Sequence, residues 1–155
     1  MINIKIKKLH KDAQMPTYAT DGSAAVDLYA IEDYLIKASE SVKWIRTGIA
    51  IEMPKGYYAE VYNRSGLAAK KELIIVSSRV IDNDYRGEIV VPMKLIASNI
   101  PIPEIFGVPI RKGDRVAQMI VKKYEKIEFE EVNKLSKTDR GGGGFGSTDR
   151  IVRGE

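Results

Sequence analysis

The sequence predicts an all-β subunit, a sandwich or barrel with Greek-key or jelly-roll connections and one short helix. In several segments apolar and polar residues alternate with a period of two, which is the pattern of a half-buried strand. Turn-forming residues separate these segments, and four prolines argue against helices in the later part of the chain: Pro92, Pro101, Pro103 and Pro109. Many short strands at close spacing are typical of this fold class.

Strands are expected where this alternation, or a strand-like apolar run, occurs. In chain order the segments are 2–9, 23–30, parts of 41–53, 57–62, 88–96, 115–121 and 126–132. Only residues 65–73 favour a helix, because they combine a capping serine with good helix formers. This helix is expected to be barely two turns long.

A change of composition divides the chain near Ser136, where the apolar pattern stops. We therefore expect a β domain over residues 1–135 and a flexible arm over residues 136–155. Four consecutive glycines at 141–144 form neither helix nor strand well, since glycine carries the largest backbone entropy cost on ordering. Arg140 precedes this run and Phe145 follows it, so the arm carries one cation and one aromatic ring.

The composition excludes several function classes. The chain of 155 residues has no cysteine and a single histidine, His10, which rules out disulfides, thiol nucleophiles and a two-histidine metal site within one chain. Any catalytic metal should then be a hard cation such as Mg²⁺ held by oxygen ligands. The absence of cysteine fits the cytoplasm or another intracellular reducing compartment.

Charge and hydropathy also argue against some partners. The net charge of +4 is spread along the chain, whereas nucleic-acid-binding proteins usually concentrate lysine and arginine in a patch. No apolar run approaches the roughly 20 residues of a membrane span, and the N-terminus lacks the apolar core of a signal peptide. We therefore expect neither a nucleic-acid nor a membrane partner.

Two polar residues interrupt apolar strands. Asp27 lies within the run at 23–30, where an ionised carboxylate is costly unless it is paired, hydrogen-bonded or near a cation. On spacing alone, a structural salt bridge with an arginine is the favoured interpretation. Gln118 lies between Val116 and Ile120 in a strand that is apolar on both faces, so it should have partners. The sequence favours two kinds of partner equally: a loop of the protein and a bound ligand.

Two further segments carry polar residues at expected turns or helix ends. Ser65 occupies the N-cap position of the short helix, whose free N–H groups together with Arg64 would suit a phosphate. A plain N-cap beside a surface arginine explains the same pattern. Asp82 and Tyr85 lie in a predicted hairpin turn between two apolar runs. Turns favour aspartate without any function, but such a turn can also present a carboxylate and a ring to one cavity.

Five segments, taken in chain order, resemble the five motifs of the trimeric dUTPase family. They are AAVDLYA, NRSGLA, VIDNDYRGE, GDRVAQMIV and RGGGGFGSTD, which together span about residues 24–149. The resemblance implies a homotrimer of jelly-roll subunits that hydrolyses dUTP to dUMP and pyrophosphate, keeping uracil out of DNA and supplying dUMP for dTMP synthesis. It also implies active sites assembled at subunit interfaces, to which one chain lends its C-terminal arm.

The same resemblance implies roles for individual residues. Asp82 and Gln118 are the expected catalytic residues: Asp82 activates the water that attacks the α-phosphorus, and Gln118 hydrogen-bonds near the phosphates. Tyr85 is expected to pack on the deoxyribose, and Asp27 to hold Mg²⁺ through water. The expected substrate-binding residues are Arg64, Ser65, Gly66, Val80, Ile81, Asp82, Tyr85, Gln118, Arg140, Phe145, Gly146 and Ser147. Within the arm, Arg140 would grip the terminal phosphate and Phe145 would stack over uracil.

The chain departs from the family pattern in two places, and two other functions remain open. Arg79 replaces a glycine that many members have two residues before the Ile81-Asp82 pair, and residues 98–110 form a longer connection than usual. Neither these residues nor the tail at 150–155 has an assigned role. The alternatives are a related enzyme of the dCTP deaminase type and a nucleotide-gated module that binds a protein partner.

Overall fold

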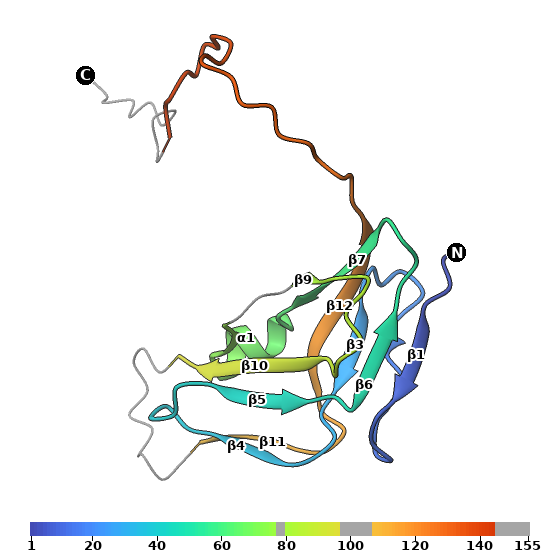
Figure 1. Cartoon of the computed structure of the whole chain (residues 1–155). Helices are drawn as coiled ribbons and strands as arrows, with labels where there is room; N and C mark the ends of the chain where they lie inside the picture. The colour runs from blue at the N-terminus through green and yellow to red at the C-terminus, as the bar shows by residue number, and fades with distance from the viewer. Residues whose placement is uncertain (77–79, 97–106, 145–155) are drawn as a thin grey trace, which may run out of the picture. The chain divides into compact units, whose positions relative to one another are not determined.

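The computed structural model describes residues 1–76, 80–96 and 107–144 (Figure 1). It divides the chain into two compact units, Met1–Glu125 and Lys126–Glu155. All strands and helices of the described residues lie in the first unit. The division between β domain and arm that the sequence suggests, at 135/136, stays a prediction.

The largest sheet of the first unit is antiparallel and has five strands. Their order across the sheet is β2 (Thr17–Tyr18), β3 (Val26–Tyr29), β12 (Arg115–Lys123), β7 (Tyr57–Tyr62) and β9 (Val80–Ile81). The long strand β12 lies at its centre between β3 and β7 (Figure 1). It therefore brings two of the predicted motifs, on β3 and β12, into direct backbone contact.

A second, three-stranded sheet has β10 (Val90–Leu95) between β5 (Lys43–Arg46) and β8 (Leu73–Ile75). Two antiparallel pairs complete the unit. They are β1 (Lys5–Lys8) with β6 (Ile49–Glu52), and β4 (Tyr34–Ile36) with β11 (Val108–Ile110). Side chains from these separate sheets form one core in which Leu28, Ile45, Val91, Ile110 and Val116 are almost completely buried.

The helix α1 (Ser65–Lys71) connects β7 to β8 and buries Leu67 against the core. It ends where Glu72 adopts a left-handed conformation, with φ of 51°, at the C-cap position. The predicted all-β fold with one short helix is thus confirmed, and the strand predicted at 57–62 has the bounds expected. No helix in the described part of the chain is long and apolar enough to cross a bilayer.

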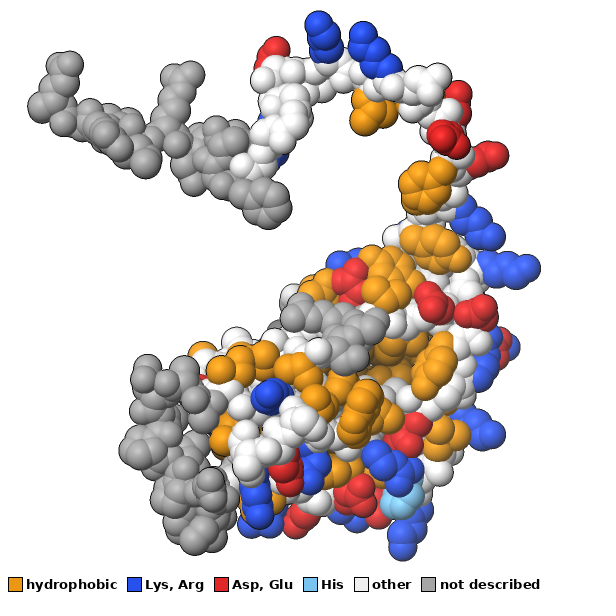
Figure 2. Space-filling model, turned by 60° about the vertical axis from the view of Figure 1, so that its left-hand side comes forward, with side chains coloured by type: hydrophobic (Ala, Val, Ile, Leu, Met, Phe, Trp, Pro, Cys, Tyr) orange, Lys and Arg blue, Asp and Glu red, His pale blue; other side chains and the backbone are white. Residues whose placement is uncertain are grey.

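The strand predicted at 126–132 is wrong for the single chain. None of these residues belongs to a strand, and their apolar side chains face solvent, with Phe129 88% and Ile127 73% exposed. A strand needs a hydrogen-bonded neighbour, and the described residues of the second unit provide no other strand. In Figure 2, hydrophobic side chains of this unit stand between charged ones at the surface.

The hairpin predicted around Asp82 has a different topology. Strands β8 and β10 do pair antiparallel, but the chain between them leaves their sheet and forms β9, which pairs with β7 of the five-stranded sheet. Ile81 packs against the core there, which explains why the apolar Val80-Ile81 pair extends into a strand. Residues 82–89 therefore pass from one sheet to the other, and this passage shapes the candidate site.

Candidate functional site

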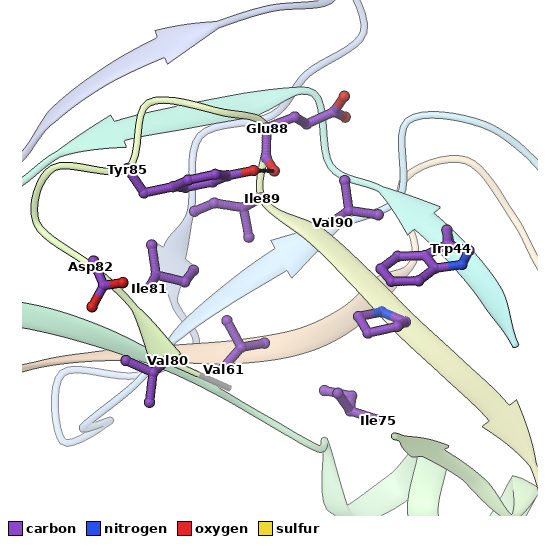
Figure 3. A pocket seen from close by; sticks show the side chains of 11 residues that line it. Trp44, Val61, Ile75, Val80, Ile81, Asp82, Tyr85, Glu88, Ile89 and Val90 are labelled. Atoms are coloured by element: carbon purple, nitrogen blue, oxygen red, sulfur yellow. Dashed lines mark hydrogen bonds between the residues drawn. The ribbon is translucent and has the colours of Figure 1, made fainter. Parts of the chain in front are cut away.

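A pocket of about 310 Å³ lies where residues 80–90 pass between the two sheets. Its lining residues are Trp44, Val61, Ile75, Val80, Ile81, Asp82, Tyr85, Glu88, Ile89, Val90 and Pro92 (Figure 3). The structure thus brings together four residues expected from the third motif: Val80, Ile81, Asp82 and Tyr85. Apolar walls with few polar groups are typical of a small-molecule pocket.

The ring of Tyr85 extends across this pocket toward Glu88 (Figure 3). The Tyr85 hydroxyl donates a hydrogen bond to the backbone carbonyl of Glu88 at 3.1 Å, and the Tyr85 N–H donates to the Asp82 carbonyl at 3.2 Å. A Cβ on Gly87 would lie 2.3 Å from the Tyr85 hydroxyl oxygen, so only glycine permits this ring position. Tyr85 as a whole is still 47% exposed, so it can pack against a ligand.

Asp82 is exposed and lines two neighbouring pockets. The second pocket is also lined by Tyr58, Val80, Asn83, Asp84, Lys123 and Tyr124. Asn83 reaches Tyr124 through a hydrogen bond of 3.4 Å between its Nδ2 and the hydroxyl. The carboxylate of Asp82 therefore lies at the border of two cavities, with access to water, as a proton acceptor requires.

Sequence reasoning missed several of these lining residues, including Trp44, Glu88 and Pro92. Trp44 is the only tryptophan of the chain, is exposed, and pairs with Pro92 across β5 and β10. Its singular occurrence in an alternating strand was a weak signal. Its place in the pocket follows only from the cross-strand register.

Asp27 forms a buried ionic cluster with two arginines. The residue is only 1% exposed, and Arg64 Nε donates to Oδ1 at 3.0 Å while Arg115 Nη1 donates to Oδ2 at 3.4 Å. Arg64 Nη1 also donates to the Arg115 carbonyl at 3.5 Å. The structure confirms the salt bridge that spacing alone favoured. Arg115, in the fourth motif, was not among the expected site residues.

The start of α1 differs from the prediction. Ser65 is the first helical residue and is exposed, and Arg64 occupies the N-cap position without a side-chain cap. The Ser65 N-cap is therefore wrong by one residue, because the Arg64 carbonyl already accepts a helical hydrogen bond from the Ala68 N–H at 3.0 Å. Around this helix start lies a pocket of about 390 Å³ that includes Arg64 and Gly66. The pocket is lined by Arg64, Gly66, Leu67, Lys71, Gly113, Asp114 and Arg115.

Three cations and one carboxylate line this pocket at the helix start, so its charge favours an anion. They are Arg64, Lys71, Arg115 and Asp114. Gln118 lies close by on β12, directly opposite Asp27 of β3 and Tyr62 of β7 in the strand register. It is half-buried, less buried than a strand apolar on both faces would make it. It is thus held at the centre of the sheet beside the Asp27 cluster.

The described residues include no group of three or more side chains suited to a metal ion. Both oxygens of the Asp27 carboxylate accept hydrogen bonds from arginine, which leaves them poorly suited to direct coordination. The residues present fit Mg²⁺ only if a bound polyphosphate and water supply its direct ligands. Mg²⁺ commonly binds in this manner, because it keeps several waters and uses substrate phosphates.

In the second unit, the start of the glycine run forms a tight turn. The Gly141 N–H donates to the Thr138 carbonyl at 3.1 Å, and Arg140 Nε donates to the Gly143 carbonyl at 2.8 Å. Gly141 has φ of +53°, a conformation that favours glycine. The expected binding residues Phe145, Gly146 and Ser147 lie outside the described residues, as does Arg79.

Comparisons with known proteins agree with the motif resemblance. The family model described as dUTPase matches residues 11–149. Deoxyuridine 5'-triphosphate nucleotidohydrolases of Hydrogenobaculum sp. and of Helicobacter pylori are each 43% identical over 148 residues. These alignments cover 95% of this chain and 98% and 97% of the two relatives.

Solved structures of dUTPases share the fold. A dUTPase of Staphylococcus bacteriophage 80alpha, solved with dUpNHpp, superposes with a TM-score of 0.82 at 24% identity, covering 94% of this chain and 98% of its own. The dUTPase of phage phi11 of S. aureus has a TM-score of 0.76 at 23% identity, covering 88% and 99%. On the match of the family model and of the bacterial relatives, the chain belongs to the dUTPase family.

Proposed function

We propose that the protein hydrolyses dUTP to dUMP and pyrophosphate, and so keeps uracil out of DNA and supplies dUMP for dTMP synthesis. One observation carries this proposal: Val80, Ile81, Asp82 and Tyr85 line one pocket, with the Asp82 carboxylate exposed at its border. The names of the relatives, which are 43% identical over nearly their full length, support the same reaction. A nucleotide precursor of DNA as substrate also fits an intracellular site of action.

Asp82 acts as the general base. An ionised carboxylate accepts a proton from a water molecule, whose oxygen then attacks the α-phosphorus of dUTP. The bond between the α-phosphorus and the oxygen bridging to the β-phosphorus breaks, and pyrophosphate leaves. Gln118 donates a hydrogen bond near the phosphates from its central position on β12. The exposure of Asp82 toward two cavities supports this role, because the attacking water must reach it.

The cationic region around α1 binds the triphosphate. Arg64, Ser65 and Gly66 are the expected phosphate ligands, and the charge of Lys71 and Arg115 in the same pocket favours an anion there. When bound, Mg²⁺ would neutralise the polyphosphate charge and orient the α-phosphorus for attack. Asp27 would act on this ion only through water, since its oxygens already accept from two arginines.

Tyr85 selects the sugar. Its partly exposed ring lies in the pocket, where it packs on deoxyribose and leaves no room for a 2′-hydroxyl. The backbone of the same turn reads uracil. Arg140 and Phe145 of the arm would close over the terminal phosphate and the base, and Gly146 and Ser147 would contact the phosphates. Ordering a glycine-rich arm is costly, so it should close only on a complete nucleotide.

We infer that the protein assembles as a homotrimer with shared active sites. Apolar side chains of the second unit are exposed: Ile127, Phe129, Val132 and Leu135. The first unit has an apolar groove of about 500 Å³ lined by Met1, Ile2, Ile4, Ile6, Met15, Pro16, Tyr18, Ala24, Val26, Ile51, Met119 and Val121. If residues 126–132 of another copy lay on the first unit, their alternating sequence would gain the strand partner that the single chain lacks.

The reaction is tested by incubating the protein and Mg²⁺ with dUTP and, separately, with dCTP. Pyrophosphate from dUTP without ammonia from dCTP is expected, whereas ammonia from dCTP would identify a deaminase.

The variant Asp82→Asn should bind nucleotide and lose about 10²–10⁴-fold in kcat, the usual contribution of a general base. Asp84→Asn is the matched control, because Asp84 is exposed in the same turn but does not line the pocket that holds Tyr85. Turnover by Asp82→Asn at the wild-type rate would remove Asp82 from the base role.

A further inference from the structure

We propose that Glu88 is a positioning residue for Tyr85, and that it thereby determines how strictly the enzyme prefers a deoxyribonucleotide to a ribonucleotide. This inference rests on the proposed function. Glu88 is the last residue of the segment VIDNDYRGE and lines the same pocket as Tyr85, yet it is not among the site residues expected from the motif resemblance.

The side chain of Glu88 is fastened to the connection between β5 and β6. Its Oε1 accepts the Gly48 N–H at 2.7 Å, and its Oε2 accepts Arg46 Nε at 3.1 Å and lies 3.0 Å from Arg46 Nη2. The Glu88 side chain is only 16% exposed, so this ion pair, in which two nitrogens of Arg46 share the oxygen Oε2, is partly shielded from water. The hydrogen bond from Arg46 to Glu88 also raises the pKa of Arg46.

The connection that receives Glu88 has little conformational freedom. Gly48 has φ of +69°, and a Cβ there would lie 2.9 Å from Ile31 Cγ2 and 3.0 Å from Ala13 Cβ. Next to it, the buried Thr47 hydroxyl donates to the Ile89 carbonyl, and the Ile89 N–H donates to the Ile49 carbonyl at 2.9 Å. Both the side chain of Glu88 and the backbone that follows are therefore held against a fixed turn.

This attachment fixes the acceptor for Tyr85. The Tyr85 hydroxyl donates to the backbone carbonyl of Glu88 at 3.1 Å, across Gly87, which offers no side chain to block the ring (Figure 3). Because Tyr85 is nearly half exposed, its own packing restrains the ring weakly. A carbonyl that cannot move therefore holds the ring in the orientation that excludes a 2′-hydroxyl. If Glu88 were released, the ring could move and the pocket would admit ribose more easily.

A role for Glu88 in stability alone would lower the amount of folded protein but leave substrate preference unchanged. The decisive readout is therefore the ratio of kcat/KM for dUTP to that for UTP. Glu88→Ala should lower this ratio roughly 10-fold, the effect of losing about one net hydrogen bond. Glu88→Gln should lower it less, because its amide oxygen can still accept the Gly48 N–H. Glu52→Ala is the matched control: it removes the ion pair between Glu52 of β6 and Lys5 of β1, away from the pocket, and it should leave the ratio unchanged.

Tyr85→Phe tests the other end of the same chain of contacts. It keeps the ring and removes only the hydroxyl, so it should lower the ratio by a similar factor. The double variant Glu88→Ala/Tyr85→Phe should be no less selective than either single variant, because both changes break one path. If Glu88→Ala does not fold, Glu88→Gln and Tyr85→Phe decide the question.

Two results have different meanings. A folded Glu88→Ala enzyme, or a Tyr85→Phe enzyme, that keeps the wild-type ratio would overturn the positioning role and leave the proposed function intact. A wild-type protein that hydrolyses neither nucleotide would refute the proposed function itself, and the inference with it.

Discussion

Replacing Asp27 with asparagine tests the buried cluster that joins the first, second and fourth motifs. The asparagine side chain has the same shape but no charge, and one of its two terminal atoms is an N–H donor. Whichever way the amide turns, either Arg64 or Arg115 then faces a donor instead of an acceptor. The variant therefore removes two charge-assisted contacts and creates one unfavourable contact at a site only 1% exposed.

The expected cost follows from the exposure of the three side chains. Removing one partner of a fully buried ion pair costs about 3–5 kcal/mol. Here the arginine side chains are 28% and 48% exposed, so they partly regain water when the carboxylate charge is lost. The loss should then approach that of a hydrogen bond to a charged group, about 1.5–3 kcal/mol. We expect Asp27→Asn to lower the free energy of unfolding by about 2–3 kcal/mol.

Urea denaturation at neutral pH measures this change, with an unaltered m value showing that the unfolding transition is the same. Asp33→Asn is the control: Asp33 also pairs with an arginine, Arg111 at 3.2 Å, but its side chain is 60% exposed. Such exposed pairs are screened by water and contribute little to the free energy of unfolding. A free energy of unfolding for Asp27→Asn within about 0.5 kcal/mol of the wild type would refute the reasoning.

Nucleotide binding by the same variant separates the two roles considered for Asp27. If Asp27 acts by holding Arg64, its loss should weaken binding of a non-hydrolysable dUTP analogue both with Mg²⁺ and with a chelator. If it acts only through water on Mg²⁺, the weakening should vanish in the chelator. We expect weaker binding under both conditions.

Four further predictions concern the core, acid pH, the arm and assembly. Leu28→Ala should lower the free energy of unfolding by about 2–5 kcal/mol in urea denaturation, because Leu28 is 1% exposed in the core. The hydrogen bond from the Lys112 backbone N–H holds the pKa of Asp33 below its ordinary value of 3.8. The contribution of ionised Asp33 to the free energy of unfolding is thus present above that value and is lost as the pH falls through the folded-state pKa. Asp33→Asn should therefore make the urea midpoint fall less steeply between about pH 5 and 2. Phe145→Ala should weaken nucleotide retention in steady-state kinetics, and unchanged KM and kcat would count against a stacking lid. Phe129→Asp should abolish the proposed trimer in light scattering while leaving the folded β unit intact.

The strands that the sequence predicted well are those whose signal is local. Residues 57–62 alternate in part and form β7 with the bounds expected. Residues 126–132 also alternate in part but form no strand in the single chain. Alternation shows that a segment suits a sheet, whereas the hydrogen-bonded neighbour must come from elsewhere. For Ile127 and Phe129 the sequence gives no information about which chain provides it.

The candidate site shows the same division. Asp82 and Tyr85 were identified from a motif of consecutive residues, and both line the expected pocket. Trp44 lies in that pocket because β5 pairs with β10, which no local pattern encodes. Glu88 belongs to the same motif as Tyr85, but its attachment to Arg46 and Gly48 depends on contacts with a distant segment. Gly87 was also part of that motif, but the reason for a glycine there is visible only in the structure: it leaves room for the Tyr85 ring.

Asp27 shows how a structural and a functional interpretation of one residue can both hold. Its salt bridge uses one N–H of Arg64, and the Arg115 carbonyl accepts a second. A guanidinium has five N–H donors in a rigid fork, so within the described contacts three remain for a phosphate. A buried carboxylate that fixes one edge of the fork makes the opposite edge a better anion receptor, because less side-chain entropy is lost on binding. Under the proposed function, the buried Asp27 would thus orient Arg64 for the triphosphate without contacting the phosphates itself.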